Sequence, residues 1–238
     1  MRILVTNDDG IHCKHMIKLA ELAKDFGEVW VVAPSSECSA MSHRVTVGRH
    51  LTLKKEPDFP VKGVHAYSLD GTPADCVKVG IQCVCPEKPD LVFSGMNVGY
   101  NLGRDVAYSG TFGAAAEGTM HGVKSIAYSL EKDADFEVPE TFFREITEML
   151  LKRDLASDEV WNVNFPGGPA EDIKGILFNR KLAAEEFYFN NYECEEVSDD
   201  ETRITARYIF SESGAEGTDL GAVTQGYISI SKIKNLVP

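Results

Sequence analysis

Apolar runs and amphipathic stretches alternate along the first 130 residues of the chain. Between the first two runs, residues 12–26 carry apolar side chains at helical spacing, and Gly27 follows as a stop signal. Strands that alternate with helices in this way build a parallel sheet with helices on both faces. We therefore expect a three-layer, Rossmann-like α/β fold with a mostly parallel sheet. Its strands are expected at residues 2–6, 28–33, 64–69, 90–93 and 125–130.

Two further helices are expected at 72–85 and 139–153. Beyond Trp161 the sequence pattern changes to short segments typical of β-strands. These pieces are either antiparallel additions to the sheet or an excursion that meets a partner subunit. The change in pattern divides the chain into a Rossmann-like domain at 1–175 and a small β-rich extension at 176–238, which is expected to return in part to the sheet. The acidic stretch 193–201 is expected to be a solvated loop or turn.

Composition excludes several classes of protein. The 238 residues carry a formal charge of -13, which argues against a broad electropositive surface for nucleic acid. No apolar run reaches the roughly 18 residues that a membrane span requires. The six cysteines include no C-x-x-C pair, and residues 2–6 already form an expected strand rather than a leader. We expect a cytoplasmic protein with reduced cysteines that binds neither nucleic acid nor membrane.

Two carboxylates follow the first expected strand. Ligands of open α/β sheets gather beyond the carboxyl ends of the strands, and Asp8-Asp9-Gly10 lies at such an end. Adjacent carboxylates bind hard divalent cations through oxygen. The plainer interpretation is that Asp-Gly is only turn chemistry.

The second expected strand ends in the polar loop 34–46. It contains hydroxyls, including that of Ser39, together with His43 and Arg44. His43 is either a proton donor or phosphate contact in a substrate loop, or an ordinary histidine of a plain surface loop.

A glycine-rich segment, residues 94–111, follows the strand at 90–93. Its glycines allow close approach of a ligand to the backbone, and Asn97 and Asn101 offer neutral oxygen ligands or amide donors. Ser109-Gly110-Thr111 then opens a helix of small residues, whose first N–H groups and dipole favour a phosphate. The combination of paired acids with a phosphate-binding helix start suits metal-assisted hydrolysis of a phosphate ester.

Other common chemistries lack their motifs. The chain has no Walker A sequence, no dinucleotide fingerprint after the first strand, no G-x-S-x-G elbow and no H-E-x-x-H pair. ATP-driven transfer and nicotinamide chemistry therefore lose support.

Four ordered blocks resemble the SurE-type stationary-phase survival proteins, a family of metal-dependent phosphatases that act on nucleoside monophosphates. The blocks are residues 7–10, 33–46, 71–77 and 94–111. The resemblance implies a cytoplasmic homodimer or homotetramer that exchanges a protruding hairpin between subunits, here expected in the stretch 178–197. It makes residues 1–175 the catalytic domain and places the β-hairpin and C-terminal extension of 176–238 in the subunit interface. It also implies one divalent cation per subunit, most readily Mg²⁺ or Mn²⁺.

The same resemblance implies roles for individual residues. Asp8, Asp9, Ser39 and Asn97 correspond to the cation ligands, and Ser109, Gly110 and Thr111 to the turn that holds the phosphate together with Asn97. Asp8 and Asp9 are the catalytic candidates, with Asp8 either base or nucleophile. The expected activity is hydrolysis of 5′- and also 3′-nucleoside monophosphates to nucleoside and phosphate.

Departures from the family pattern keep other functions open. His15 replaces a usual glycine after the acid pair, Ala40 and Ser42 replace frequent glycines, and Arg44 stands where a small residue is usual. One alternative is a catalytically silent nucleotide-binding sensor. Another is a phosphatase of short polyphosphate or of a different small phosphoester.

Overall fold

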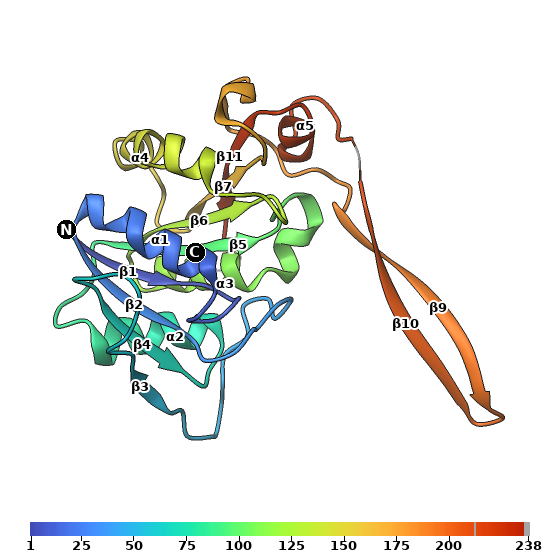
Figure 1. Ribbon diagram of the computed structural model, residues 1–238, viewed down its shortest axis with the longest axis horizontal. Coiled ribbons are helices and arrows are strands. Elements are labelled where there is room, and N and C mark those ends of the chain that lie inside the picture. The colour runs from blue at the N-terminus through green and yellow to red at the C-terminus, as the bar shows by residue number, and fades with distance from the viewer. Residues whose placement is uncertain (212, 236–238) are drawn as a thin grey trace.

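The core of the molecule is one mixed sheet, shown in the computed structural model of Figure 1. The structure describes residues 1–211 and 213–235, and within them nine strands form this sheet in the order β3-β4-β2-β1-β5-β6-β7-β11-β8. The strands β1, β2, β4, β5, β6 and β7 run parallel to their neighbours in this group. They comprise Arg2–Thr6, Glu28–Pro34, His65–Leu69, Leu91–Val98, Lys124–Leu130 and Glu159–Phe165. The expected parallel α/β sheet is confirmed.

Two strands from the end of the chain extend the sheet. β11 (Ile228–Lys234) pairs antiparallel with β7, and β8 (Ile176–Phe178) lies parallel beside β11. At the opposite edge, β3 (Leu53–Lys55) pairs antiparallel with β4, and the sequence pattern had not predicted it. The division into domains at residues 1–175 and 176–238 remains a prediction.

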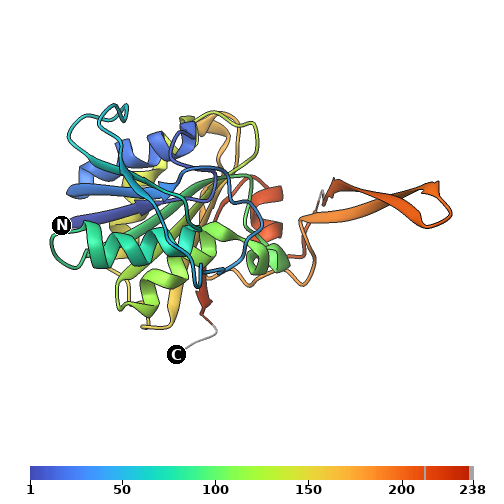
Figure 2. The same ribbon diagram turned by 90° about the horizontal axis from the view of Figure 1, so that it is seen from below.

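Helices cover both faces of the sheet, with α1 on one side and α2 and α3 on the other in Figure 2. α1 (Lys14–Ala23) and α4 (Glu137–Leu151) cover the first face, where Met16 and Phe143 are fully buried against strand residues. α2 (Pro73–Val79) and α3 (Gly110–Met120) cover the second face through Val77 and Ala114. Short 3₁₀ segments cover Lys24–Phe26, Gly103–Tyr108 and Ala170–Asp172, and Gly80–Val84 is a π-helical turn.

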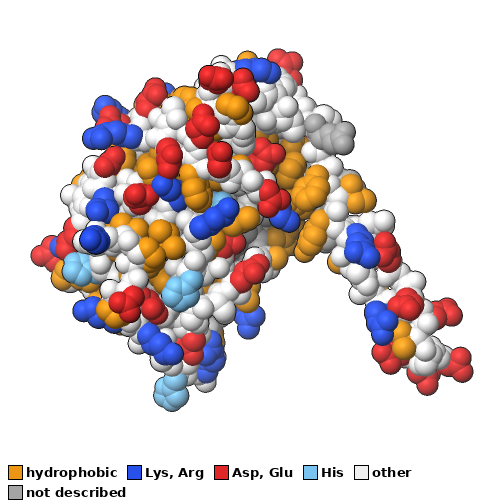
Figure 3. All heavy atoms as spheres, in the orientation of Figure 1, with side chains coloured by type: hydrophobic (Ala, Val, Ile, Leu, Met, Phe, Trp, Pro, Cys, Tyr) orange, Lys and Arg blue, Asp and Glu red, His pale blue; other side chains and the backbone are white. Residues whose placement is uncertain are grey.

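A long two-stranded hairpin projects from the body of the protein (Figure 1). β9 (Tyr188–Ser198) pairs antiparallel with β10 (Glu201–Phe210). The hairpin lies further along the chain than the predicted stretch 178–197. The interpretation of 193–201 as a loop or turn was wrong for most of its length, since β9 runs to Ser198. Acidic side chains gather at the far end of the hairpin in Figure 3. Water solvates exposed side chains on a two-stranded ribbon as fully as on a loop, so their charge does not distinguish the two.

The predicted burial of the tryptophans and cysteines is confirmed only in part. Trp161 is buried and belongs to the core, whereas Trp30 is only partly buried. The sequence predicts that Cys83, Cys85 and Cys194 pack rather than react; Cys85 is buried, whereas the prediction of packing is wrong for the exposed Cys83 and Cys194. A short helix, α5 (Asp219–Thr224), was not predicted from the sequence. Within the described residues, no helix has both the length and the apolar composition for a membrane crossing.

Candidate active site

The carboxyl ends of β1 and β5 bring the acid pair to the glycine-rich segment. The two strands are neighbours in the sheet, with Thr6 opposite Ser94, so the residues after them emerge at the same edge. Asp9 Oδ2 accepts a hydrogen bond of 3.1 Å from the backbone N–H of Val98. Asp8 and Asp9 therefore meet the segment that carries Asn97, although 89 residues separate Asp9 from Val98.

Asp8 lies at the N-terminus of α3, where both of its oxygens are held by one residue. The backbone N–H of Thr111 donates to Oδ2 at 3.1 Å, and the Thr111 hydroxyl donates to Oδ1 at 2.5 Å. The positive end of the helix dipole also favours a carboxylate there. Gly110 permits this approach, because a Cβ at that position would lie 2.9 Å from the Cβ of Asp8.

Ser109 has a structural function in the same turn. It is the N-cap of α3, and its Oγ accepts a hydrogen bond of 3.0 Å from the backbone N–H of Phe112. The structure thus places Ser109, Gly110 and Thr111 directly beside Asp8. Their binding of a phosphate remains a prediction.

The side chain of Asn97 turns its oxygen toward this cluster. Its Nδ2 donates to the carbonyl of Gly99 at 2.7 Å, and its Oδ1 lies 3.4 Å from Oγ1 of Thr111. The pairing register of β5 with β6 shifts between Ser94 and Asn97. Such irregularities redirect side chains at the end of a strand.

The acid pair carries charge that no neighbouring cation balances. Burial raises the pKa of Asp8, and hydrogen bonds from Thr111 offset part of that rise. Burial and repulsion by Asp8 raise the pKa of Asp9 to about 7. Glu37 adds further negative charge to the surroundings of both groups. Among the described residues, no Lys, Arg or His forms an ion pair with Asp8, Asp9 or Glu37.

These donors fit a hard divalent cation, which prefers carboxylate, amide and hydroxyl oxygens. In the described part of the chain, no group of three or more His, Cys, Asp or Glu side chains is placed to hold a metal. A cation at this site therefore needs the neutral oxygens of Asn97 and nearby hydroxyls, or water, besides the two carboxylates.

Ser39 is the predicted ligand that the structure does not join directly to the pair. Its hydroxyl donates to Oε1 of Glu37 at 2.7 Å, and within the described residues no hydrogen bond links it to Asp8, Asp9 or Asn97. The preceding residue, Cys38, connects this loop to the acid pair, because its backbone N–H donates a hydrogen bond of 2.7 Å to the carbonyl of Asp8. Sequence reasoning missed Glu37, whose only signal was an acid in a polar loop after a strand.

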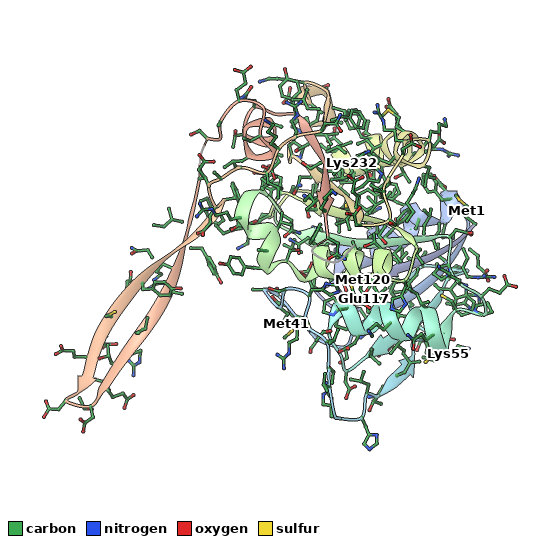
Figure 4. The ribbon with its side chains drawn as sticks, turned by 180° about the vertical axis from the view of Figure 1, so that it is seen from behind. Met1, Met41, Lys55, Glu117, Met120 and Lys232 are labelled. Carbon is green, nitrogen blue, oxygen red and sulfur yellow. The ribbon has the colours of Figure 1, made fainter. Side chains whose placement is uncertain are left out.

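His43 is anchored to the middle of α3. Its Nε2 lies 2.7 Å from Oε2 of the buried Glu117, which also meets His121 at 3.0 Å and Lys78 at 3.3 Å. Figure 4 labels Glu117 on α3 and Met41 on the loop that contains His43. Burial raises the pKa of Glu117, but the contacts with His43 and Lys78 outweigh it and lower that pKa to about 2. Sequence reasoning missed Glu117, although a lone acid among small helix residues was a usable signal.

Residues 38–46 form a loop that we call the cover loop. Hydrogen bonds fix this loop at further points besides His43. The backbone N–H of Ser42 donates to the carbonyl of Tyr108 at 2.9 Å. The Thr46 hydroxyl donates to Asp75 at 2.6 Å, and the Thr72 hydroxyl donates to the carbonyl of Arg44 at 2.5 Å. Asp75 also completes the capping box of α2, so its function is structural.

A cavity of about 360 Å³ opens beside the cover loop. Glu37 and Cys38 line it on the side of the acid pair. Its other lining residues come from the cover loop and its continuation and from the end of β4, and include Met41, Arg44, Val45, Val47, Arg49, Gly71 and Thr72.

The glycine-rich segment is braced by the C-terminal part of the chain. Asp105 accepts hydrogen bonds of 2.9 Å from the backbone N–H groups of Phe187 and Tyr188. Asp219 accepts one of 2.8 Å from Gly103, and the Tyr188 hydroxyl accepts one of 3.0 Å from the N–H of Tyr100. The base of the hairpin and the segment that carries Asn97 are therefore one connected unit.

Comparison with known proteins yields consistent matches. The family model described as "Survival protein SurE" matches residues 3–186. A protein of Thermoanaerobacter sp. (strain X514) named "5'-nucleotidase SurE" is 40% identical over 237 residues, covering 98% of this chain and 92% of that protein. One of the same name from Heliobacterium modesticaldum is 39% identical, covering 98% of this chain and 86% of its own. The crystal structure of the SurE protein from Aquifex aeolicus superposes with a TM-score of 0.84 at 33% identity, covering 100% of this chain and 95% of that one.

Proposed function

The chain belongs to the SurE family, and we propose that it is a divalent-metal-dependent phosphomonoesterase that hydrolyses nucleoside 5′-monophosphates to nucleoside and phosphate. Nucleoside 3′-monophosphates are proposed as further substrates. The observation that carries this proposal is the position of Asp8, whose carboxylate lies at the N-terminus of α3 beside Asp9 and Asn97, without a balancing cation among the described residues. The relatives' name, 5'-nucleotidase, gives the substrate class.

We propose that Asp8, Asp9 and Asn97 hold one Mg²⁺ or Mn²⁺, with Ser39 as the fourth ligand from the cover loop. The two buried, mutually repelling carboxylates and the amide oxygen support this assignment. Bound there, the ion supplies neutralisation of charge on the phosphoryl oxygens and acidification of a water molecule.

Residues of the protein bind the phosphate, orient Asp8 and accept the proton of the attacking water. The first turn of α3, at Ser109, Gly110 and Thr111, binds the phosphate through its N–H groups and its dipole. Thr111 occupies both oxygens of Asp8, which keeps that carboxylate in one orientation. Asp9 uses only Oδ2 for a hydrogen bond among the described residues, so its Oδ1 is the oxygen available to accept the proton of the attacking water. The cover loop excludes bulk water from the cleft, and His43 fastens it to α3.

The test compares phosphate release from AMP by the wild-type protein, by Asp8→Asn and by Asp199→Asn. Asp199 is an exposed acid in the turn of the hairpin, so its substitution changes the net charge equally without touching the cleft. We expect at least a hundredfold loss of kcat in Asp8→Asn alone. Binding of Mn²⁺, measured by electron paramagnetic resonance, is expected to weaken in the same variant. Equal turnover by all three proteins contradicts the proposal, and stoichiometric binding of AMP without turnover supports a sensor instead.

We further propose that the hairpin pairs with a second copy of the chain to form a homodimer, which is also the unit of a homotetramer. An isolated two-stranded ribbon is at best marginally stable in water, yet this one exposes Tyr192, Ile204 and Tyr208 by 60–66%. Sedimentation measurements on the wild type and on Ile204→Asp test this. A wild-type dimer that dissociates in the variant supports the proposal, and a monomeric wild type contradicts it.

The cytoplasm is the proposed compartment of this activity. All six cysteines are free in the structure, which is the usual state in reducing surroundings.

A further inference from the structure

The guanidinium of Arg44, on the wall of the cavity next to Cys38, has no partner among the residues that the structure describes. Arg44 lines the cavity, and among the described residues its guanidinium forms no hydrogen bond and no ion pair. The other arginine of the wall is engaged, because the guanidinium of Arg49 binds Asp70 through both the carboxylate and the backbone carbonyl. In a chain with a net charge of -13, an unpaired arginine facing a cavity is available to an anion.

The backbone that carries Arg44 is held firmly. Its carbonyl accepts a hydrogen bond from Thr72, the preceding His43 is bound to Glu117, and Thr46 is bound to Asp75. These anchors flank Arg44 on both sides, so its position at the cavity wall is set by the fold. The side chain itself is exposed, so the fold fixes the backbone at this position and leaves the guanidinium accessible to an anion.

The cavity that Arg44 lines comes within one backbone contact of the acid pair, although neither Asp8 nor Asp9 lines it. Cys38 lines the same cavity, and its N–H donates to the carbonyl of Asp8. The volume of about 360 Å³ lies within the range of small-ligand sites, and Met41 and Val45 provide apolar surface for a base.

We propose that Arg44 forms a second phosphate subsite that selects nucleoside bisphosphates, substrates with phosphates at two separate positions of the ribose. One phosphate occupies the first turn of α3, the nucleoside lies in the cavity, and the second phosphate pairs with the guanidinium. The planar fork of arginine binds two phosphate oxygens at once. The reaction is unchanged, since water forms the new bond to phosphorus and the ribose oxygen leaves with a proton. The inference rests on the proposed nucleotidase function and specifies its substrate class.

The experiment measures kcat/KM for adenosine 3′,5′-bisphosphate, ADP and AMP in the wild type, Arg44→Ala, Arg44→Lys and Arg144→Gln. Arg144 is an exposed arginine on α4, so Arg144→Gln controls for the lost charge. We expect the wild type to prefer the bisphosphate to AMP by about tenfold, and Arg44→Ala to lose that preference through a higher KM. Arg44→Lys should keep part of it, and added salt should weaken it.

The outcomes separate this inference from the function on which it rests. If neither the wild type nor any variant hydrolyses AMP, the proposed nucleotidase function is overturned. If AMP is hydrolysed but the ratio of bisphosphate to AMP is the same in the wild type and Arg44→Ala, only the subsite is overturned. A preference for ADP that Arg44→Ala abolishes also contradicts the proposal, because it places the second phosphate next to the first.

Discussion

His43 Nε2 lies 2.7 Å from Oε2 of Glu117, and this contact joins the cover loop to the helix whose first turn holds Asp8. Gly113 makes room for the loop, since a Cβ there would come within 2.9 Å of the His43 Cα. The loop that bears Ser39 and Arg44 is therefore positioned from α3 rather than free at the surface.

Removal of the Glu117 charge should loosen the cover loop and destabilise the fold. In Glu117→Gln the contacts with His43, His121 and Lys78 lose their ionic character, and hydrogen bonds to charged groups contribute about 1.5–3 kcal/mol. We expect the free energy of unfolding in urea to fall by about 2 kcal/mol. KM for AMP should rise more than kcat falls, because the loop carries Ser39 and Arg44, which we propose to bind the cation and the substrate. Glu145→Gln, at an exposed position of α4, is the control, and equal effects in both variants would refute the anchoring role.

The same carboxylate predicts a pH dependence of stability. The folded-state pKa of Glu117 is about 2, below the ordinary range of a glutamate. The unfolded chain therefore binds the proton more readily, so the stabilisation is complete above the unfolded pKa and is lost as the pH falls toward 2. We expect the stability difference between the wild type and Glu117→Gln to shrink between pH 5 and pH 3. Urea titrations at each pH measure it, and a constant difference would count against the assignment.

His15 illustrates a departure from the family pattern with a stability cost. It is 1% exposed, its Nε2 has no hydrogen-bond partner in the described residues, and its ring packs against Phe136. Burial lowers its pKa to about 4, so the wild type loses stability as the pH falls from about 6.5 toward 4. We expect His15→Leu to be at least as stable at pH 7 and to gain on the wild type at pH 5. His50→Leu, at an exposed position, should show no such gain. A destabilised His15→Leu at pH 5 would show that the ring nitrogen is needed.

Gly110 tests the contact between Asp8 and α3 without a change in charge. In Gly110→Ala the new methyl group would lie 2.9 Å from the Cβ and 3.0 Å from Oδ2 of Asp8, which displaces the carboxylate from Thr111. Alanine suits the first turn of a helix, so the protein should remain folded by circular dichroism. A misplacement of about 1 Å can cost roughly a hundredfold in rate, so kcat for AMP should fall by up to about that factor. Unaltered kcat for AMP in a folded variant would show that this geometry is not required.

The sequence predicted five of the six parallel strands, because buried strands produce continuous apolar runs, and it placed the candidate site residues at strand ends, where ligands gather. The expectation of antiparallel additions or an excursion beyond Trp161 was wrong for β7, which runs parallel to β6. β3 escaped prediction, and residues 193–198 of β9 were wrongly expected to form a loop, for one physical reason. Every residue of Leu53–Lys55 is exposed, and the acids of β9 match no buried pattern, since cross-strand contacts such as Arg203 with Glu195 replace a core. Periodicity reports burial and cannot detect strands that bury nothing.

The contacts that complete the site were beyond the reach of the sequence for a different reason. Glu117 and His43 are 74 residues apart, and Asp219 reaches Gly103 across 116 residues. Each side chain is unremarkable in its local context, and only the folded topology brings the partners together. The residues at strand ends could be identified from the local sequence, whereas the long-range hydrogen bonds and ion pairs that hold the loops could not.

The most direct test of the central claim is phosphate release from AMP by metal-stripped protein before and after addition of Mn²⁺ or Mg²⁺, with Asp8→Asn alongside. The account predicts no release without metal, restored release on addition to the wild type, and none in the variant at any metal concentration used. Undiminished release by the stripped wild type, or full metal-restored activity in Asp8→Asn, would contradict a cation-dependent site on the acid pair.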